Sequence, residues 1–210
     1  MEFSRPASEL IARRTSCRTY LDLPIDTEKR DVLERFMKAG CVGPFGTRMR
    51  FGLIASQEGD RGALKGLGTY GVIKDAAGFI LGATTEGPKD LEDFGYALER
   101  IILFATDLEL GTCWLGGTLT KSRFARRFGI RDGEELPAAV SVGDPSEQRT
   151  AVEAISRRYA GSHNRLPWED LFFDGDFGSP MTPEAAGEYA AVLEMVRIAP
   201  SASNKQPWRI

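Results

Sequence analysis

Histidine and cysteine are scarce in this sequence of 210 residues, which contains one histidine and three cysteines. The single histidine, His163, excludes a histidine-rich zinc site and an HExxH protease motif, and it leaves one residue for chemistry that needs a histidine base. Cys17, Cys41 and Cys113 form no CxxC pair. The sequence therefore predicts reduced thiols rather than a disulfide framework. Cys113 has apolar neighbours, which favours packing over a role as nucleophile.

An excess of positive charge and long hydrophobic runs are also lacking. The chain carries 27 basic and 30 acidic residues, so no overall basic field attracts nucleic acid or an acidic membrane. The basic stretch 121–131 is interpreted as a solvated helix face, with a nucleic-acid contact as the minor alternative. The longest apolar runs, such as 101–105, are far shorter than the ~20 residues that cross a bilayer. With no signal-peptide pattern at the N-terminus, we expect a cytoplasmic protein.

The remaining composition is that of a globular protein, with 42% hydrophobic and 27% charged residues. Apolar periodicity predicts a mixed α+β fold in which helices and strands alternate irregularly. We expect one domain over 1–210, because no proline-rich spacer or block of like charge divides the chain. The predicted helices cover 6–14, 27–39, 90 to a stop at Gly111, 122–128, and 182 to just before Pro200. The predicted strands cover 51–55, 78–83, 113–115, 138–142, and the residues leading to Ile210.

A weak internal repeat relates 32–50 to 192–210. The two stretches align without gaps and share four of nineteen residues, beginning with a common Val-Leu-Glu. Each is interpreted as a helix, a turn of small residues and proline, and the start of a strand. This parallel in predicted structure supports the repeat more strongly than the identities do.

Residues 14–20 form the first candidate site. In an extended segment alternate side chains share a face, so Arg14, Ser16, Arg18 and Tyr20 are expected to project together. Two guanidiniums beside a hydroxyl suit a phosphate group, which arginine binds in a forked geometry. The alternative is a solvated helix end, where basic residues are favoured in any case.

Two glycine-rich stretches have different interpretations. Residues 66–71 match GxGxxG, but a dinucleotide fingerprint needs a strand before it and a helix after it, and here the order is reversed. We interpret that stretch as a turn. Residues 111–117 cross a predicted strand and end on Gly116 and Gly117, where the backbone can approach a flat ligand closely. A buried strand followed by an ordinary turn is the alternative.

Residues 199–208 are the most informative segment. Ser201, Ser203, Asn204 and Gln206 lie between two prolines that stiffen the backbone. A rigid turn so rich in amides and hydroxyls suits recognition of a planar heterocycle with alternating N–H and C=O groups.

Four segments together resemble the FMN-dependent nitroreductases. Residues 200–208 resemble the flavin-contacting motif PSxxNxQPW, and 14–20 resemble the N-terminal phosphate-binding motif. Residues 110–116 are similar to the segment that passes the flavin ring, and 163–167 to the late loop that completes the phosphate site. His163 stands where the family often has lysine, so the resemblance assigns this phosphate contact to Arg165.

The resemblance implies a nitroreductase-like fold, with a central mixed or antiparallel sheet flanked by helices, and an FMN cofactor reduced by NAD(P)H. The acceptor would be a nitro, quinone or similar small molecule. No catalytic side chain or metal is implied, because the flavin carries the chemistry. Alternatives are another flavin reaction such as dehalogenation, or an FMN- or nucleotide-binding carrier or sensor without turnover. The residues implied to bind the cofactor are Arg14, Ser16, Arg18, Leu115, Gly116, Arg165, Pro200, Ser201, Asn204 and Gln206.

The position of the PSxxNxQPW motif departs from the family pattern. Ordinary members carry it soon after the phosphate motif, where this chain has 39–45, with almost none of the polar residues. Because the motif reaches the flavin of the partner subunit in family homodimers, we expect one chain here to combine both roles. The sequence resembles a single-chain pseudo-dimer subgroup with an internal pseudo-twofold repeat. It would be a monomer of this kind or a homodimer, with phosphate binding in 1–172 and an incomplete second repeat in 173–210.

Overall fold

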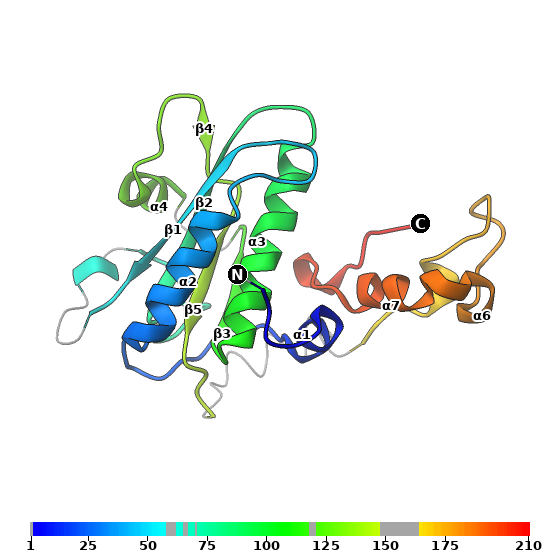
Figure 1. The fold of residues 1–210 in the computed structure, drawn as a ribbon, viewed down its shortest axis with the longest axis horizontal. Helices are drawn as coiled ribbons and strands as arrows, with labels where there is room; N and C mark the ends of the chain where they lie inside the picture. Colours follow the sequence, from blue (N-terminus) through cyan, green and yellow to red (C-terminus); the bar gives the residue numbers. More distant parts are fainter. Residues whose placement is uncertain (1, 58–61, 65–66, 70, 118–120, 148–163) are drawn as a thin grey trace.

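The computed structural model describes residues 2–57, 62–64, 67–69, 71–117, 121–147 and 164–210. Its centre is a five-stranded antiparallel sheet with strand order β1-β2-β5-β3, in which β4 pairs with the end of β2 (Figure 1). The strands are β1 (Met49–Ala55), β2 (Gly78–Thr85), β3 (Gly111–Leu115), β4 (Glu134–Glu135) and β5 (Ala139–Gly143). The predicted α+β class and its four principal strands are confirmed.

Strand β2 is apolar along its length because both faces of the sheet are covered. Ile80 packs into a core with helices α2 (Thr27–Ala39) and α3 (Asp90–Asp107), whereas Phe79 and Leu81 pack on the other face. Helix α4 (Lys121–Phe128) contributes its buried Phe124 to that second core and exposes Lys121, Arg123, Arg126 and Arg127. The interpretation of α4 as a solvated basic face fits this arrangement.

The end of helix α3 differs from the prediction. The helix ends at Asp107, and Glu109 adopts a left-handed backbone with φ of 64°. Gly111 is the first residue of β3 instead of the helix stop. A Cβ atom at Gly111 would lie 2.8 Å from the Cβ of Cys17, so this glycine allows two segments to approach closely. At the other end, Leu91 is exposed and does not join the apolar stripe.

The predicted helix before Pro200 is interrupted. Thr182 caps α6 (Pro183–Ala186) as predicted, accepting from the Ala185 N–H. Gly187 then has a φ of 54°, which breaks the helix before η3 (Gly187–Tyr189) and α7 (Ala190–Ile198).

The chain after α7 forms a turn rather than the predicted strand. It contains the short helix η4 (Ala202–Asn204) and ends in extended backbone. The N–H of Ile210 donates to the Leu171 carbonyl, and the Phe173 N–H donates to the Ile210 carbonyl. These bonds hold the last residue against 171–173. Because these backbone hydrogen bonds involve only the last residue, 199–210 do not form a strand.

Helix α7 lies beside α1 (Ala7–Arg13), and the segment 164–210 extends away from the sheet (Figure 1). Pro6 occupies the cap position of α1 instead of its first turn. Two further short helices are η1 (Gly62–Leu64) and η2 (Trp168–Asp170). Within the described part of the chain, Cys17, Cys41 and Cys113 form no disulfide bond. Among the described residues, no helix is long and apolar enough to cross a membrane.

Candidate functional site

Arg14 follows the last turn of α1 and is buried. Its backbone N–H donates to the Leu10 carbonyl, and its extended φ and ψ then turn the chain away from the helix. The Nε atom lies 3.5 Å from Oε1 of Glu99, a residue of α3. Arg14 is thus held between the N-terminal helix and the long helix that covers the sheet.

The segment after Arg14 runs beside strand β3. Ser16 forms a parallel bridge with Thr112, and the Cys17 N–H donates to the Thr112 carbonyl at 2.8 Å. The predicted phosphate-binding motif therefore lies along β3, the edge strand that belongs to the segment predicted to pass the flavin ring.

Tyr20 points into the core. Its hydroxyl donates to the Cys17 carbonyl at 2.7 Å and lies 2.8 Å from the Ser141 hydroxyl. Burial raises the pKa of Tyr20 well above its ordinary value, and the Arg18 charge opposes this rise. Tyr20 therefore has a structural role, while Arg18 lies near enough for its charge to act on the phenol.

Arg165 brings a second cation to Arg14. Burial lowers the pKa of Arg165, and the positive charges of Arg14 and Arg197 lower it further. Its Nη1 donates to Oδ1 of Asn204 at 2.8 Å, and its Nη2 donates to the Ile198 carbonyl at 3.0 Å. Hydrogen bonds thus join the late loop to the C-terminal motif at the Arg165 guanidinium, and the charge of Arg14 acts on it from the N-terminal motif.

The C-terminal turn is tied together by its own polar side chains. The hydroxyl of Ser201 accepts from the Gln206 N–H at 2.9 Å. Gln206 is buried, and its Oε1 accepts from the Leu166 N–H at 2.8 Å. Nδ2 of Asn204 donates to the Asn164 carbonyl at 2.8 Å. The amides predicted to contact a ring also fix this turn against 164–166.

Left-handed backbone is concentrated in the same turn. Ser203, Asn204 and Gln206 have φ values of 51°, 55° and 47°. Such residues cost free energy and persist where the surrounding contacts determine the conformation, which is common at binding sites. Pro200 precedes this turn and is partly exposed.

Glu99 pairs with Arg14 and was not among the predicted site residues, and it also contacts Trp114 of the predicted segment 110–116. Oε2 of Glu99 accepts a hydrogen bond from Nε1 of Trp114 at 2.7 Å. Burial raises the pKa of Glu99, while the Arg14 charge and the Trp114 N–H oppose the rise.

Leu115 and Gly116 end strand β3. The Leu115 side chain is buried in the core, so only its backbone is available to a ligand. Gly116 is exposed, and a Cβ there would meet no atom within 4 Å. Neither residue makes a hydrogen bond to the C-terminal turn within the described part of the chain.

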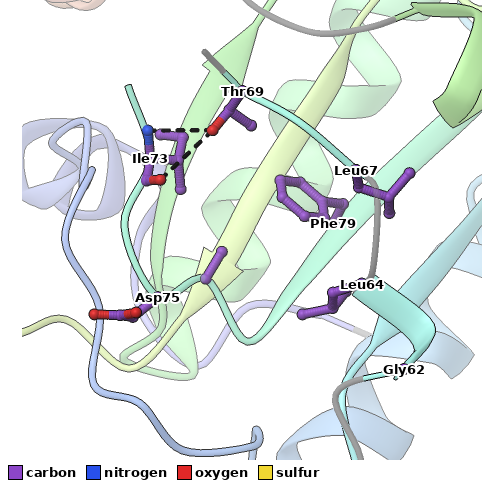
Figure 2. A pocket seen from close by; sticks show the side chains of 8 residues that line it. Gly62, Leu64, Leu67, Thr69, Ile73, Asp75 and Phe79 are labelled. Carbon is purple, nitrogen blue, oxygen red and sulfur yellow. Dashed lines mark hydrogen bonds between the residues drawn. The ribbon is translucent and has the colours of Figure 1, made fainter. Parts of the chain in front are cut away.

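Two cavities have different linings. A cavity of about 490 Å³ is lined mainly by apolar side chains, and Figure 2 shows Leu64, Leu67 and Phe79 on its wall, with Thr69 bonded to Ile73. It contains no predicted site residue, and the GxGxxG stretch beside it lies partly outside the described residues. A smaller cavity of about 270 Å³ is lined by Arg14, Cys17 and Gly111 among others. Arg14 is the one predicted cofactor-binding residue among the described residues that line it, and no residue of 164–210 does.

Hydrogen bonds thus join Arg165, Asn204, Gln206 and Ser201 in one group, and the charge of Arg14 lies near enough to act on Arg165. Ser16 lies two residues after Arg14 and forms the bridge to Thr112 of β3. His163 lies outside the described residues.

Comparisons with known proteins agree with this architecture. A family model described as "Putative TM nitroreductase" matches residues 7–210. No curated protein matches the chain. A solved "putative nitroreductase" of Thermotoga maritima is 19% identical with a TM-score of 0.57, and the match covers 100% of this chain and 72% of that chain.

Two further solved structures have the same fold. A nitroreductase family protein of Clostridium difficile is 23% identical with a TM-score of 0.54, over 80% of this chain and 94% of that one. A "putative nitroreductase in complex with FMN" from Desulfovibrio desulfuricans is 24% identical with a TM-score of 0.52, over 72% and 95%. The chain has the nitroreductase fold and, by the match over 7–210, belongs to the putative TM nitroreductase family.

Proposed function

We propose that the chain is an FMN-dependent oxidoreductase that takes hydride from NADH or NADPH and reduces a nitro, quinone or similar small acceptor. The observation that carries the proposal is the hydrogen bonding of Arg165 to Asn204 of the C-terminal turn and to the Ile198 carbonyl, with the charge of Arg14 near enough to act on the same guanidinium. Family membership supports the same reading, and one solved neighbour is a complex with FMN.

The residues present fit an FMN phosphate. The positive charges of Arg14 and Arg197 each lie close enough to act on Arg165. Glu99 and Glu194 supply two negative charges, so the cluster keeps an excess of positive charge. Guanidinium groups bind phosphate oxygens in pairs, and a partly buried cluster strengthens that attraction.

The C-terminal turn also fits the ring of a flavin. The indole Nε1 of Trp208 is buried and has no hydrogen-bond partner among the described residues. A buried donor without a partner costs free energy, so a ligand acceptor there would be favourable. The fixed amides of Asn204 and Gln206 give the turn a preset shape.

Each group of residues has a distinct task in this proposal. Arg14, Ser16, Arg18 and Arg165 hold the phosphate, and Pro200, Ser201, Asn204 and Gln206 orient the ring. The backbone at Leu115 and Gly116 lies where a flat group can approach closely. The chemistry supplied by bound FMN is hydride acceptance and electron transfer to the acceptor.

We further propose that one chain combines the roles of two family subunits, as a pseudo-dimer with an internal pseudo-twofold repeat. The turns of the two predicted copies are held differently. Phe45 and Thr47, in the first turn, donate their backbone N–H groups to buried Asp93 at 2.8 Å each. A Cβ at Gly43 would collide with that carboxylate. The first turn is fixed to α3, which leaves flavin contacts to the second turn.

A cofactor assay tests the proposal. The purified chain is expected to be yellow, to release FMN on denaturation, and to lose its visible flavin absorbance on anaerobic addition of NADH or NADPH. A chain that neither contains nor binds FMN would contradict the proposal. Bound FMN that neither nucleotide reduces would instead support a carrier.

A further inference from the structure

The carboxylate of Glu99 contacts both parts of the proposed site. Oε2 accepts from the Trp114 indole at 2.7 Å, and Oε1 lies 3.5 Å from Nε of Arg14. Trp114 belongs to β3, which leads to the proposed ring site, and Arg14 belongs to the proposed phosphate site. One side chain of α3 thus lies between them.

This carboxylate is held away from water. Its side chain is 27% exposed and that of Arg14 is 7% exposed. Burial disfavours a charged carboxylate, and the neighbouring cation compensates for this cost. Glu99 and Arg14 therefore depend on each other for charge neutralisation when no anion is bound.

A second ion pair nearby has a tighter geometry. Glu194 accepts from Nε and Nη2 of Arg197 at 2.7 Å each, so both carboxylate oxygens are used. Arg14, in contrast, faces Glu99 through Nε alone, and within the described residues it makes no other ion pair. Of these two arginines, Arg14 is the one whose terminal amino groups remain open to an incoming anion.

We propose that Glu99 is the resident counterion of Arg14 and that a bound phosphate group competes with it for that guanidinium. The inference rests on the proposed function and assigns Glu99 the role of limiting phosphate affinity. A negative charge beside the site repels the phosphate, and it also relieves the repulsion between Arg14 and Arg165 in the empty site. Both effects weaken anion binding.

The substitution Glu99→Gln tests this role. Glutamine has the same shape and still accepts the Trp114 hydrogen bond, but it carries no charge. We expect the variant to bind FMN roughly tenfold more tightly, because a like charge has been removed from a partly buried site. Affinity for riboflavin, which lacks the phosphate, should stay unchanged. Glu92→Gln is the matched control, since Glu92 lies on the same helix and is exposed.

The opposite result would overturn the inference. If Glu99 merely holds Arg14 in place, Glu99→Gln weakens FMN binding. The background Arg14→Gln separates the two roles further, because competition for that guanidinium predicts a smaller gain in FMN affinity from Glu99→Gln there than in the unaltered chain. A gain of the same size in both backgrounds would contradict the competition. The double variant leaves no buried unpaired charge, so it remains usable if Glu99→Gln fails to fold.

A test with inorganic phosphate does not require FMN, so its result is independent of the proposed function. Phosphate should raise the melting temperature of Glu99→Gln more than that of the unaltered chain, with chloride at equal ionic strength as the control. An equal or smaller shift would overturn the competition whether or not FMN binds. A chain that ignores FMN but shows the larger phosphate shift would contradict only the proposed function.

Discussion

Nη1 of Arg165 donates a hydrogen bond of 2.8 Å to Oδ1 of Asn204. The two residues come from motifs that the family resemblance assigns to opposite ends of FMN, one to the phosphate and one to the ring. Their contact means that the proposed ring turn and the proposed phosphate cation are parts of one hydrogen-bonded unit. A change at either residue is expected to affect both ends of the site.

The substitution Asn204→Ala should weaken FMN binding by about tenfold. It removes the bonds to Arg165 and Asn164, and alanine also disfavours the left-handed backbone at φ of 55°. Asn204→Gly is the control, because glycine accepts that backbone without cost. Flavin fluorescence titration should show a loss in both variants, and wild-type affinity in the glycine variant would rule out a role for the amide.

The substitution Arg165→Gln should weaken binding of FMN roughly ten- to a hundredfold, the range for loss of a charge-assisted contact to phosphate. Riboflavin binding should change much less. The ratio of the two dissociation constants, measured by fluorescence, isolates the phosphate contribution. A parallel loss for both ligands would mean that Arg165 acts only through the turn that it supports.

Two glycines of the same strand region should respond differently to alanine. Gly111→Ala places a Cβ within 2.9 Å of the Cys17 side chain, so it should lower the free energy of unfolding by about 1–3 kcal/mol. Gly116→Ala has open space and should leave stability unchanged while weakening FMN binding. Thermal unfolding and flavin titration on both variants check this pair. Unaltered FMN affinity in Gly116→Ala would remove that backbone from the proposed site.

The pair of Arg50 and Glu134 predicts an acid-sensitive contribution to stability. Hydrogen bonds from Arg50 and the Arg131 N–H lower the pKa of Glu134 from 4.5 to about 2, against the effect of burial. The charged carboxylate therefore stabilises the fold above about pH 4.5, and this contribution is lost as the pH falls towards 2.

Glu134→Gln should accordingly lower the free energy of unfolding by about 1–3 kcal/mol at neutral pH. The difference from the unaltered chain should shrink on acidification, as urea titrations at several pH values would show. A difference independent of pH would mean that the charge of Glu134 is not what stabilises the pair.

Sequence patterns predicted the sheet and most helices because their signals are local. The apolar run at Phe79–Leu81 and the Thr182 cap of α6 each depend on neighbouring residues alone. The predicted end of α3 was wrong because Gly111 is the residue that lets β3 pass close to Cys17, which is distant in sequence. The final strand was wrong because 199–210 fold into a turn held by Gln206.

The site was predictable only through its motifs. Charge and spacing suggested a phosphate contact at Arg14 but left a solvated helix end open, and burial beside Glu99 now argues against that alternative. The contact of Arg165 with Asn204 depends on how the C-terminal segment docks, which no local pattern encodes. Glu99 escaped notice because a single glutamate within a helix has no sequence signature.

The like charges of Arg14 and Arg165 lie across the junction between the N-terminal helix and the C-terminal segment. The repulsion between Arg14 and Arg165 disfavours docking of the C-terminal segment. An anion bound by both arginines would attract both of them and so favour docking. The ionic composition of the solvent should therefore govern how firmly the C-terminal segment attaches to the N-terminal helix. The attraction of one anion for both arginines would then form the site and hold the C-terminal segment in place.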